Sequence, residues 1–195
     1  TGIINAYNFM DGINGITGGY SLVILSALAY INAEIVPFVE QSLILIMMCS
    51  VLVFNFFNFR KYAKCFAGDV GSVSIAFVIL FLIGRLIIKT ENISWIILFA
   101  VYGVDSVLTI IHRLMLRENI SLPHRKHLYQ IMANELKIPH TIVSFIYMMI
   151  QAIVIIGYFV FQKYDYWYLL GSIFILCCLY VFFINKYFKL HISSK

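Results

Sequence analysis

The segment "NAYNFMDGINGITGG", residues 5–19, gathers three amides, one carboxylate and four glycines ahead of a long apolar run. Asn8 and Asp11 are three residues apart, so they share a face if one helical turn contains both. The glycines would let backbone or ligand approach closely. Because turns and helix caps use the same residue types, the segment taken alone favours a cap ahead of a helix.

A second polar segment, "CFAGDVGS", places Asp69 between Gly68 and Gly71, with Ser72 opening the next apolar run. A carboxylate among glycines and a hydroxyl is a hard-oxygen setting suited to Mg²⁺, which completes its shell with water and substrate phosphates. The alternative is again a helix N-cap. Only neighbouring polar groups would favour the metal site.

A third polar segment, "RENISLPHRKHLYQ", contains His124, Arg125, Lys126 and His127 in a row after Pro123. Arginine offers a forked donor to phosphate, and histidine offers a proton near neutral pH. An ordinary basic loop on the cytoplasmic side of a membrane would have a similar composition. The density of histidine favours a phosphate or pyrophosphate site.

The composition identifies an integral membrane protein. Of 195 residues, 62% are hydrophobic and 12% charged, and the mean hydropathy is +0.92. Since a span of the ~30 Å hydrocarbon layer needs roughly 20 apolar residues, six spans are predicted. They cover residues 16–33, 38–57, 72–88, 94–116, 141–162 and 167–188. The predicted fold is all-α, a polytopic transmembrane helical bundle.

The lysines and arginines divide unevenly between the two sides of these spans. Most of them fall in segments 1–15, 58–71, 114–140 and 186–195, whereas only Lys89 and Lys163 fall clearly on the other side. The positive-inside rule therefore makes the first set cytoplasmic. The net charge of +5 then reflects topology and not nucleic-acid binding. All three polar segments lie on that cytoplasmic face, which predicts an active site there.

Asp105 falls near the middle of the fourth predicted span. With Thr109, His112 and Arg113 it forms a stripe of about 12 Å that runs toward the cytoplasmic end. An ionisable group at that depth is costly unless it is paired or faces a wet cleft, so Asp105 is a functional candidate.

The chain is expected to be one membrane domain over residues 1–195. It opens at Thr1 without an initiator Met or a signal-like segment, so we expect the C-terminal part of a longer protein. Its four cysteines lack paired metal or redox spacing and are interpreted as small apolar fillers.

Taken together, the three segments resemble motifs of the polyprenyl-phosphate N-acetylhexosamine-1-phosphate transferases, the polytopic phosphoglycosyltransferases of glycosyltransferase family 4. "NAYNFMDGINGI" is similar to N-x-x-N-x-x-D-G-x-[ND]-G, "FAGDVGS" to F-M-G-D-x-G-S, and "HRKHLYQ" to H-R-x-H-x-Y-Q. The three motifs follow in family order from the first residue to about residue 130.

The resemblance implies that an N-acetylhexosamine-1-phosphate passes from a UDP-sugar to polyprenyl (undecaprenyl) phosphate, with release of UMP. It implies Asp69 as the Mg²⁺ ligand, or Mn²⁺ ligand, and Asp69 with His127 as the catalytic residues. The substrate site it implies contains Asn5, Asn8, Asp11, His124 and Arg125. The expected location is the bacterial inner membrane with the site on its cytoplasmic face, and a homodimer is left open.

Tyr129 and Gln130 replace the consecutive histidines of the muramoyl-pentapeptide branch, so an initiator of O-antigen (lipopolysaccharide) or capsule-like glycans is favoured over the cell-wall enzyme. The spacing from Asn58 to Asp69 is one residue longer than in related branches, which leaves the role of Asn58 open. The paired Asp residues that precede the first motif in the family are absent, so this piece alone is expected to be inactive. A polytopic membrane transporter is the alternative, because transporters also bury charges in glycine-interrupted helices.

Overall fold

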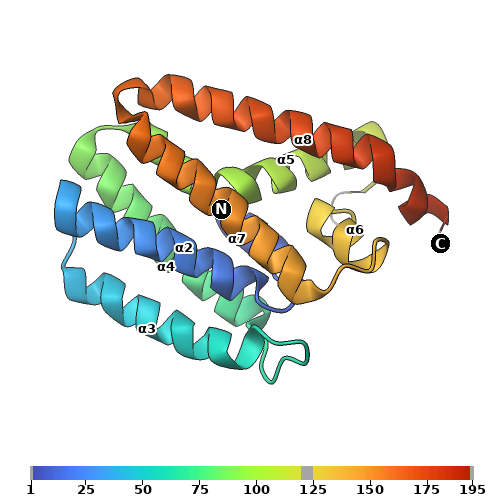
Figure 1. The fold of residues 1–195 in the computed structure, drawn as a ribbon, viewed down its shortest axis with the longest axis horizontal. Helices are drawn as coiled ribbons and strands as arrows, with labels where there is room; N and C mark the ends of the chain where they lie inside the picture. Colours follow the sequence, from blue (N-terminus) through green and yellow to red (C-terminus); the bar gives the residue numbers. More distant parts are fainter. Residues whose placement is uncertain (1, 120–124, 194–195) are drawn as a thin grey trace.

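The structure is a computed structural model that describes residues 2–119 and 125–193, with side chains described as far as residue 188 (Figure 1). The described residues form helices and no strand. The helices are α1 (Gly2–Met10), α2 (Ile16–Tyr30) with its π-helical extension η1 (Ile31–Ile35), α3 (Gln41–Asn58), α4 (Gly68–Thr90), the 3₁₀ helix η2 (Ile93–Phe99), α5 (Ala100–Met115), α6 (Leu128–Asn134), α7 (His140–Val160), η3 (Gln162–Tyr164) and α8 (Asp165–Ser193).

Within the described ranges, 2–119 and 125–193, six helical segments are long and apolar enough to cross a membrane, which confirms the predicted all-α bundle. They are Ile16–Ile35, Gln41–Asn58, Gly68–Thr90, Ile93–Met115, His140–Val160 and Gln162–Phe188. The segments outside these spans contain more helix than expected. Residues 2–10 were expected in a cytoplasmic loop, but they form α1, which packs against α4 and α5. The start of α4 at Gly68 shortens the next loop to residues 59–67.

A buried aromatic group lies where α1, α2 and α5 meet. The rings of Tyr20 and Tyr102 stack with centroids 3.6 Å apart, and Tyr7 meets Tyr102 edge-on at 5.0 Å. Around this group, α2 packs against α3 and α7, while α8 lies along the edge of the bundle opposite α3 and contacts α5 and α6 (Figure 1). Large apolar side chains such as Phe77 and Phe174 remain exposed on the outside of the bundle, as a lipid-facing surface requires.

The fourth span is broken, although the sequence predicts one continuous helix over residues 94–116. It changes from 3₁₀ to α geometry at Phe99, where φ is −108° and ψ is 9°. A break inside a bilayer leaves backbone groups that water cannot reach, so other helices must satisfy them.

Gln151, fully buried on α7, satisfies the backbone at this break. Its Nε2 donates to the carbonyl of Ile97 at 3.0 Å, and its Oε1 accepts from the N–H of Val101 at 3.2 Å. Tyr20 donates to the same Oε1 at 2.7 Å and accepts from the N–H of Tyr102 at 3.3 Å. The break is therefore a tertiary feature supported by α7 and α2.

The segments predicted to be cytoplasmic meet at one end of the bundle. Asn14 donates to the carbonyl of Arg60 at 2.9 Å, and Tyr129 donates to the carbonyl of Phe9 at 2.8 Å. The opposite end has a smaller polar group that the sequence did not predict, made of Asn92, Ser94, Tyr158 and Asp165. These side chains form hydrogen bonds with one another and so join the turns at that end of the bundle.

We predict that cysteines placed at Lys61 and Lys163, both exposed, react with a membrane-impermeant thiol reagent from opposite sides. The Lys/Arg asymmetry puts Lys61 in the cytoplasm. Labelling in intact and in opened cells measures this, and reaction of both positions from one side would contradict the topology. Ser121, which the sequence also offers for this purpose, lies outside the described residues.

Replacing Gln151 by Leu is expected to destabilise the folded protein by about 1–3 kcal/mol. The reason is that the N–H of Val101 loses its acceptor inside the membrane and the carbonyl of Ile97 keeps only the backbone N–H of Ala100. Thermal unfolding in detergent measures the change. Ile153→Leu, an apolar exchange at an exposed position of the same helix, is the control. Equal stability of the Gln151→Leu protein and the wild type would show that the break does not need this side chain.

Candidate functional site

Asn8 lies in the last turn of α1 and joins that helix to α4. Its Oδ1 accepts a hydrogen bond from the Ser72 hydroxyl at 2.8 Å, and Ser72 is fully buried. The condition under which Asn8 and Asp11 would share one helical face is not met, because α1 ends at Met10. The two residues instead come together through α4, as each contacts the first turns of that helix.

Asp11 follows α1 and is held from two sides. Its Oδ1 accepts from the hydroxyl of Thr17 at 2.7 Å, and its carboxylate also accepts from the backbone N–H of Gly68. Burial raises the pKa of Asp11 above its usual range, and the negative charge of nearby Asp69 raises it further, while the two hydrogen bonds act in the opposite direction. Two carboxylates therefore lie close together where α4 begins.

Asp69 is not the N-cap of α4, since Ala67 holds that position and makes no side-chain cap bond. Asp69 lies in the first helical turn and is exposed, and no hydrogen bond joins its carboxylate to another of the described residues. Gly68 before it has φ of +60°, a conformation that favours glycine. The cap alternative is wrong for Asp69, whose side chain remains available to a ligand.

The pair formed by Asp11 and Asp69 fits a Mg²⁺ ion. Mg²⁺ commonly binds one or two protein carboxylates and keeps water and substrate phosphates as its other ligands. A cation between two carboxylates also relieves the repulsion that raises the pKa of Asp11. Among the described residues no group of three acidic, histidine or cysteine side chains is placed to hold a metal without such added ligands.

Asn58, whose role the sequence left open, holds the backbone of two segments next to this pair. Its Oδ1 accepts from the N–H of Gly15 at 2.7 Å, and its Nδ2 donates to the carbonyl of Cys65 at 2.8 Å. Asn58 is buried, and Gly15 has φ of +85° and lies against the ring of Phe59. Asn58 therefore ties the loop 59–67 to the start of α2 and fixes the segment that leads to Asp69.

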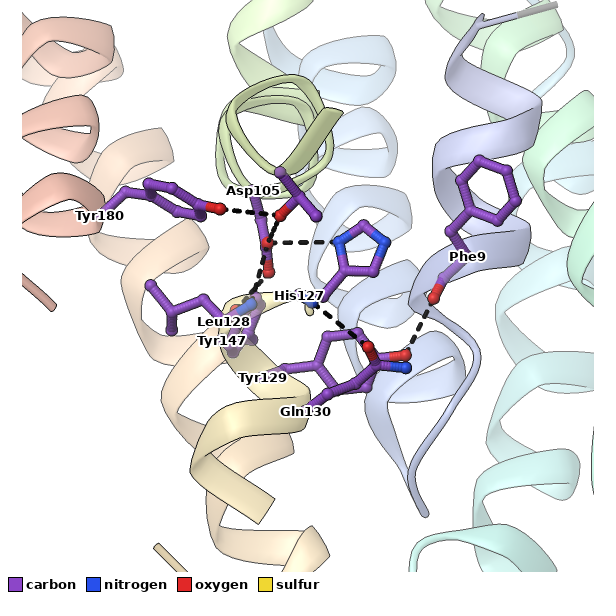
Figure 2. Close-up of polar contacts among 9 residues, drawn as sticks. Phe9, Asp105, His127, Leu128, Tyr129, Gln130, Tyr147 and Tyr180 are labelled. Carbon is purple, nitrogen blue, oxygen red and sulfur yellow. Dashed lines mark hydrogen bonds and ion pairs between the residues drawn. The ribbon is translucent and has the colours of Figure 1, made fainter. Parts of the chain in front are cut away.

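His127 lies immediately before α6 and faces Asp105 on α5 (Figure 2). Its Nδ1 is 3.3 Å from Asp105 Oδ1, which also accepts from the N–H of Leu128 at 3.1 Å. Tyr147 on α7 donates to Oδ2 at 2.6 Å, and Thr109 on α5 donates to Oδ1 at 3.1 Å. The buried carboxylate thus connects α5, α6 and α7.

Two contacts bring the start of α6 against the end of α1. The Tyr129 hydroxyl bonds to the carbonyl of Phe9, and the rings of Phe9 and His127 have centroids 6.3 Å apart (Figure 2). Gly12 has no room for a side chain here, because an added Cβ would lie 2.2 Å from the Tyr129 hydroxyl oxygen. His127 therefore lies at the same end of the bundle as the carboxylate pair.

Lys126 is not available to a phosphate, unlike the row of free basic side chains that the sequence suggested. It is buried and forms an ion pair with Glu118, which also pairs with the buried Arg113 at 3.3 Å. The hydrogen bond from Lys126, reinforced by Arg113, lowers the pKa of Glu118. These two cations stabilise the turn after α5, and His112 packs on the ring of Phe188 instead of continuing the predicted stripe.

The sequence-predicted residues fall into two groups and some outliers. Asn8, Asp11 and Asp69 form one group, and His127 belongs to the other. Asn5 on α1 and Arg125 before α6 are exposed, and His124 lies outside the described residues. Sequence reasoning missed Tyr147, because a tyrosine within an apolar span carries no signal that distinguishes a lipid-facing ring from a buried donor.

An apolar cavity of about 470 Å³ opens beside the carboxylate pair, between α2, α3 and α4. Thr17, which binds Asp11, lines it together with Phe66, Ala67 and Gly71 from the segment around Asp69. The carboxylates therefore adjoin a space that accepts an apolar or aromatic part of a ligand.

Known proteins are similar to the part of the chain that contains Asn8, Asp11 and Asp69. Residues 1–87 match the sequence profile of glycosyl transferase family 4. A "probable undecaprenyl-phosphate N-acetylglucosaminyl 1-phosphate transferase" of Bacillus subtilis is 33% identical over 132 residues, which cover 66% of this chain and 37% of the relative.

Two further relatives show how far the similarity extends. An "undecaprenyl-phosphate alpha-N-acetylglucosaminyl 1-phosphate transferase" of Escherichia coli is 32% identical over 142 residues, 66% of this chain and 37% of the relative. A "phospho-N-acetylmuramoyl-pentapeptide-transferase" of Streptococcus suis is 36% identical over 78 residues, 38% of this chain and 22% of the relative. The chain thus spans little more than a third of the length of the first two relatives.

Proposed function

We propose a function on the premise that this chain belongs to glycosyl transferase family 4 and to its polyprenyl-phosphate hexosamine-1-phosphate transferases. The full-length protein transfers an N-acetylhexosamine-1-phosphate from a UDP-sugar to polyprenyl phosphate and releases UMP. The observation that carries the proposal is the convergence of Asp11, Asp69 and His127 at one end of a membrane-spanning bundle. A membrane-bound acceptor and a soluble donor can meet only at such a face.

The transfer moves a phosphoryl-type group, and it needs alignment of the phosphates and stabilisation of developing charge. A Mg²⁺ ion, or Mn²⁺, held by Asp69 and Asp11 would neutralise charge on the diphosphate. Asn8, fixed by Ser72, has an amide directed at the start of α4 and orients the donor. Asn5 belongs to the same binding surface through α1.

On the other side of the site, His127 and Arg125 act on the phosphates. Arg125 is exposed, so its guanidinium is free to move onto a bound phosphate and bind it with two hydrogen bonds. His127 is buried and held in place, which suits a group that exchanges a proton or a hydrogen bond with one phosphate oxygen. His124, which precedes Arg125 by one residue, completes this basic segment in the proposal.

We assign the reaction to the initiating step of a bacterial cell-surface glycan of the O-antigen or capsule type, at the cytoplasmic face of the inner membrane, with undecaprenyl phosphate as acceptor. The names of the Bacillus subtilis and Escherichia coli relatives support undecaprenyl phosphate as the acceptor. Tyr129 and Gln130, which replace the consecutive histidines of the muramoyl-pentapeptide branch, favour this type of glycan over the cell wall. A transporter is disfavoured, because the polar side chains at the opposite end, Asn92 and Asp165 among them, bond to each other.

Replacing Asp69 by Asn in the full-length protein is expected to lower UMP release by a factor of about 10² or more, with part of the loss recovered at raised Mg²⁺ or Mn²⁺. The reason is that the amide keeps the shape of the side chain and removes the charge that attracts the cation. UMP produced from a UDP-N-acetylhexosamine and polyprenyl phosphate, measured against divalent-ion concentration at matched protein levels, checks this.

Glu91→Gln is the matched control, because it removes one negative charge from an exposed side chain at the far end of the same helix. It should leave both the rate and the metal dependence unchanged. Near-normal turnover of the Asp69→Asn protein with unchanged metal dependence would contradict the role of Asp69.

Replacing His127 by Ala should reduce transfer by about tenfold or more while the protein remains in the membrane at normal levels, since a positioned acid–base group contributes at least that much. His112→Ala is the control, because the His112 ring packs on Phe188 and no hydrogen bond among the described residues joins it to His127 or to Asp11 and Asp69. Membrane quantities from immunoblots are compared with initial rates. If the loss of activity matched a loss of protein, His127 would be a structural residue.

A further inference from the structure

Asp105 is the most deeply placed acidic side chain near the site, and the reaction outlined above does not use it. Only 4% of its surface is exposed, and it lies within a span where an isolated carboxylate is costly. Side chains on α5 and α7, and the ring of His127 just before α6, turn toward it. This raises the question of what the charge does.

We infer that Asp105 is a positioning residue that fixes the imidazole of His127, so that Nδ1 carries a proton and Nε2 is the ring atom presented to the phosphates. The inference deepens the proposed function and rests on it. Asp105 itself touches no substrate in this assignment and acts only through His127.

The hydrogen-bond pattern around the carboxylate carries the inference (Figure 2). The N–H of Leu128, the hydroxyl of Tyr147 and the hydroxyl of Thr109 all donate to it, at 3.1, 2.6 and 3.1 Å. An ionised carboxylate has no hydrogen to give, so the ring nitrogen 3.3 Å from Oδ1 must be the donor. The neutral ring of His127 is therefore the Nδ1–H tautomer.

The backbone of His127 is held as firmly as its ring. Its N–H donates to the Gln130 side chain at 3.2 Å, and the following N–H, that of Leu128, donates to Asp105. In Figure 2 the second ring nitrogen points away from Asp105, toward the helix that carries Phe9. That helix is α1, which also contains Asn8. The fixed ring thus directs Nε2 to the side where the first motif lies.

This orientation sets the proton chemistry of the site. In the neutral ring, Nε2 accepts a proton or hydrogen bond, and in the protonated ring Nε2–H donates one to a phosphate oxygen, while Nδ1–H stays with Asp105 in both forms. Proton exchange with substrate is therefore confined to Nε2. The negative charge of Asp105 also favours the protonated ring, as in other arrangements where a buried Asp orients a histidine.

A structural role for Asp105 makes a different prediction. If it served only to join α5, α6 and α7, a neutral acceptor would bind Leu128 and Tyr147 equally well, and the tautomer of His127 would be irrelevant. Asn retains one acceptor oxygen and the size of Asp but lacks the charge. Asp105→Asn therefore separates a positioning residue from a joining residue.

The first measurement reads the tautomer directly. Full-length protein labelled with ¹⁵N-histidine is examined by NMR at alkaline pH, where the neutral ring dominates, and the His127 signals are assigned by their loss in His127→Gln. We expect Nδ1 to be the protonated nitrogen. A His127 ring with its proton on Nε2 would overturn the inference, whether or not the protein transfers a sugar phosphate.

The second measurement compares initial rates at matched protein levels. Asp105→Asn should lower the rate of transfer by about tenfold or more, with little change in KM for the UDP-sugar. Asp165→Asn, the same change at a hydrogen-bonded aspartate at the opposite end of the bundle, should have no effect. A wild-type rate for Asp105→Asn would overturn the inference. Absence of transfer in the wild-type protein would overturn the proposed function alone, because the tautomer is read without turnover.

Discussion

A carboxylate within a membrane span is stable only when donors inside the protein surround it, because water is absent at that depth. Asp105 meets this requirement through Thr109 on its own helix, Leu128 at the start of α6 and Tyr147 on α7. The same bonds determine where α6 begins and how His127 faces. One electrostatic requirement thus positions a functional candidate and joins three helices.

The break in the fourth span follows the same rule for uncharged groups. The N–H of Val101 has to be paired within the bilayer, and Gln151 accepts from it while also donating to the carbonyl of Ile97 from the neighbouring helix. Tyr20 adds a second support from α2. Because α5 begins at the break, the depth of Asp105 depends on a glutamine and a tyrosine far away in the chain.

At the end of the bundle predicted to face the cytoplasm, some side chains hold the fold and others stay exposed. Asn58 and Asn14 hold loop backbones, Lys126 and Arg113 are engaged with Glu118, and Asp69 and Arg125 remain exposed. The side chains that hold the fold are buried or paired, whereas Asp69 and Arg125, both proposed to meet a charged substrate, stay accessible. His127 is the exception, because it is proposed to act on the phosphates and is buried. Asp11 is intermediate, since it is partly buried and hydrogen-bonded but close to Asp69.

The sequence by itself determined the membrane class, the six spans and the polar segments at one end, because hydrophobic length and the distribution of charged residues are local properties that a bilayer selects directly. Tertiary structure alone decided the break at Phe99, the helix at residues 2–10 and the use of Asn58. It also decided which polar groups share the start of α4, since Asn8 reaches Ser72 across 64 residues. Such pairings depend on how the helices pack, and a pattern along one chain does not specify the partner that a buried donor will find.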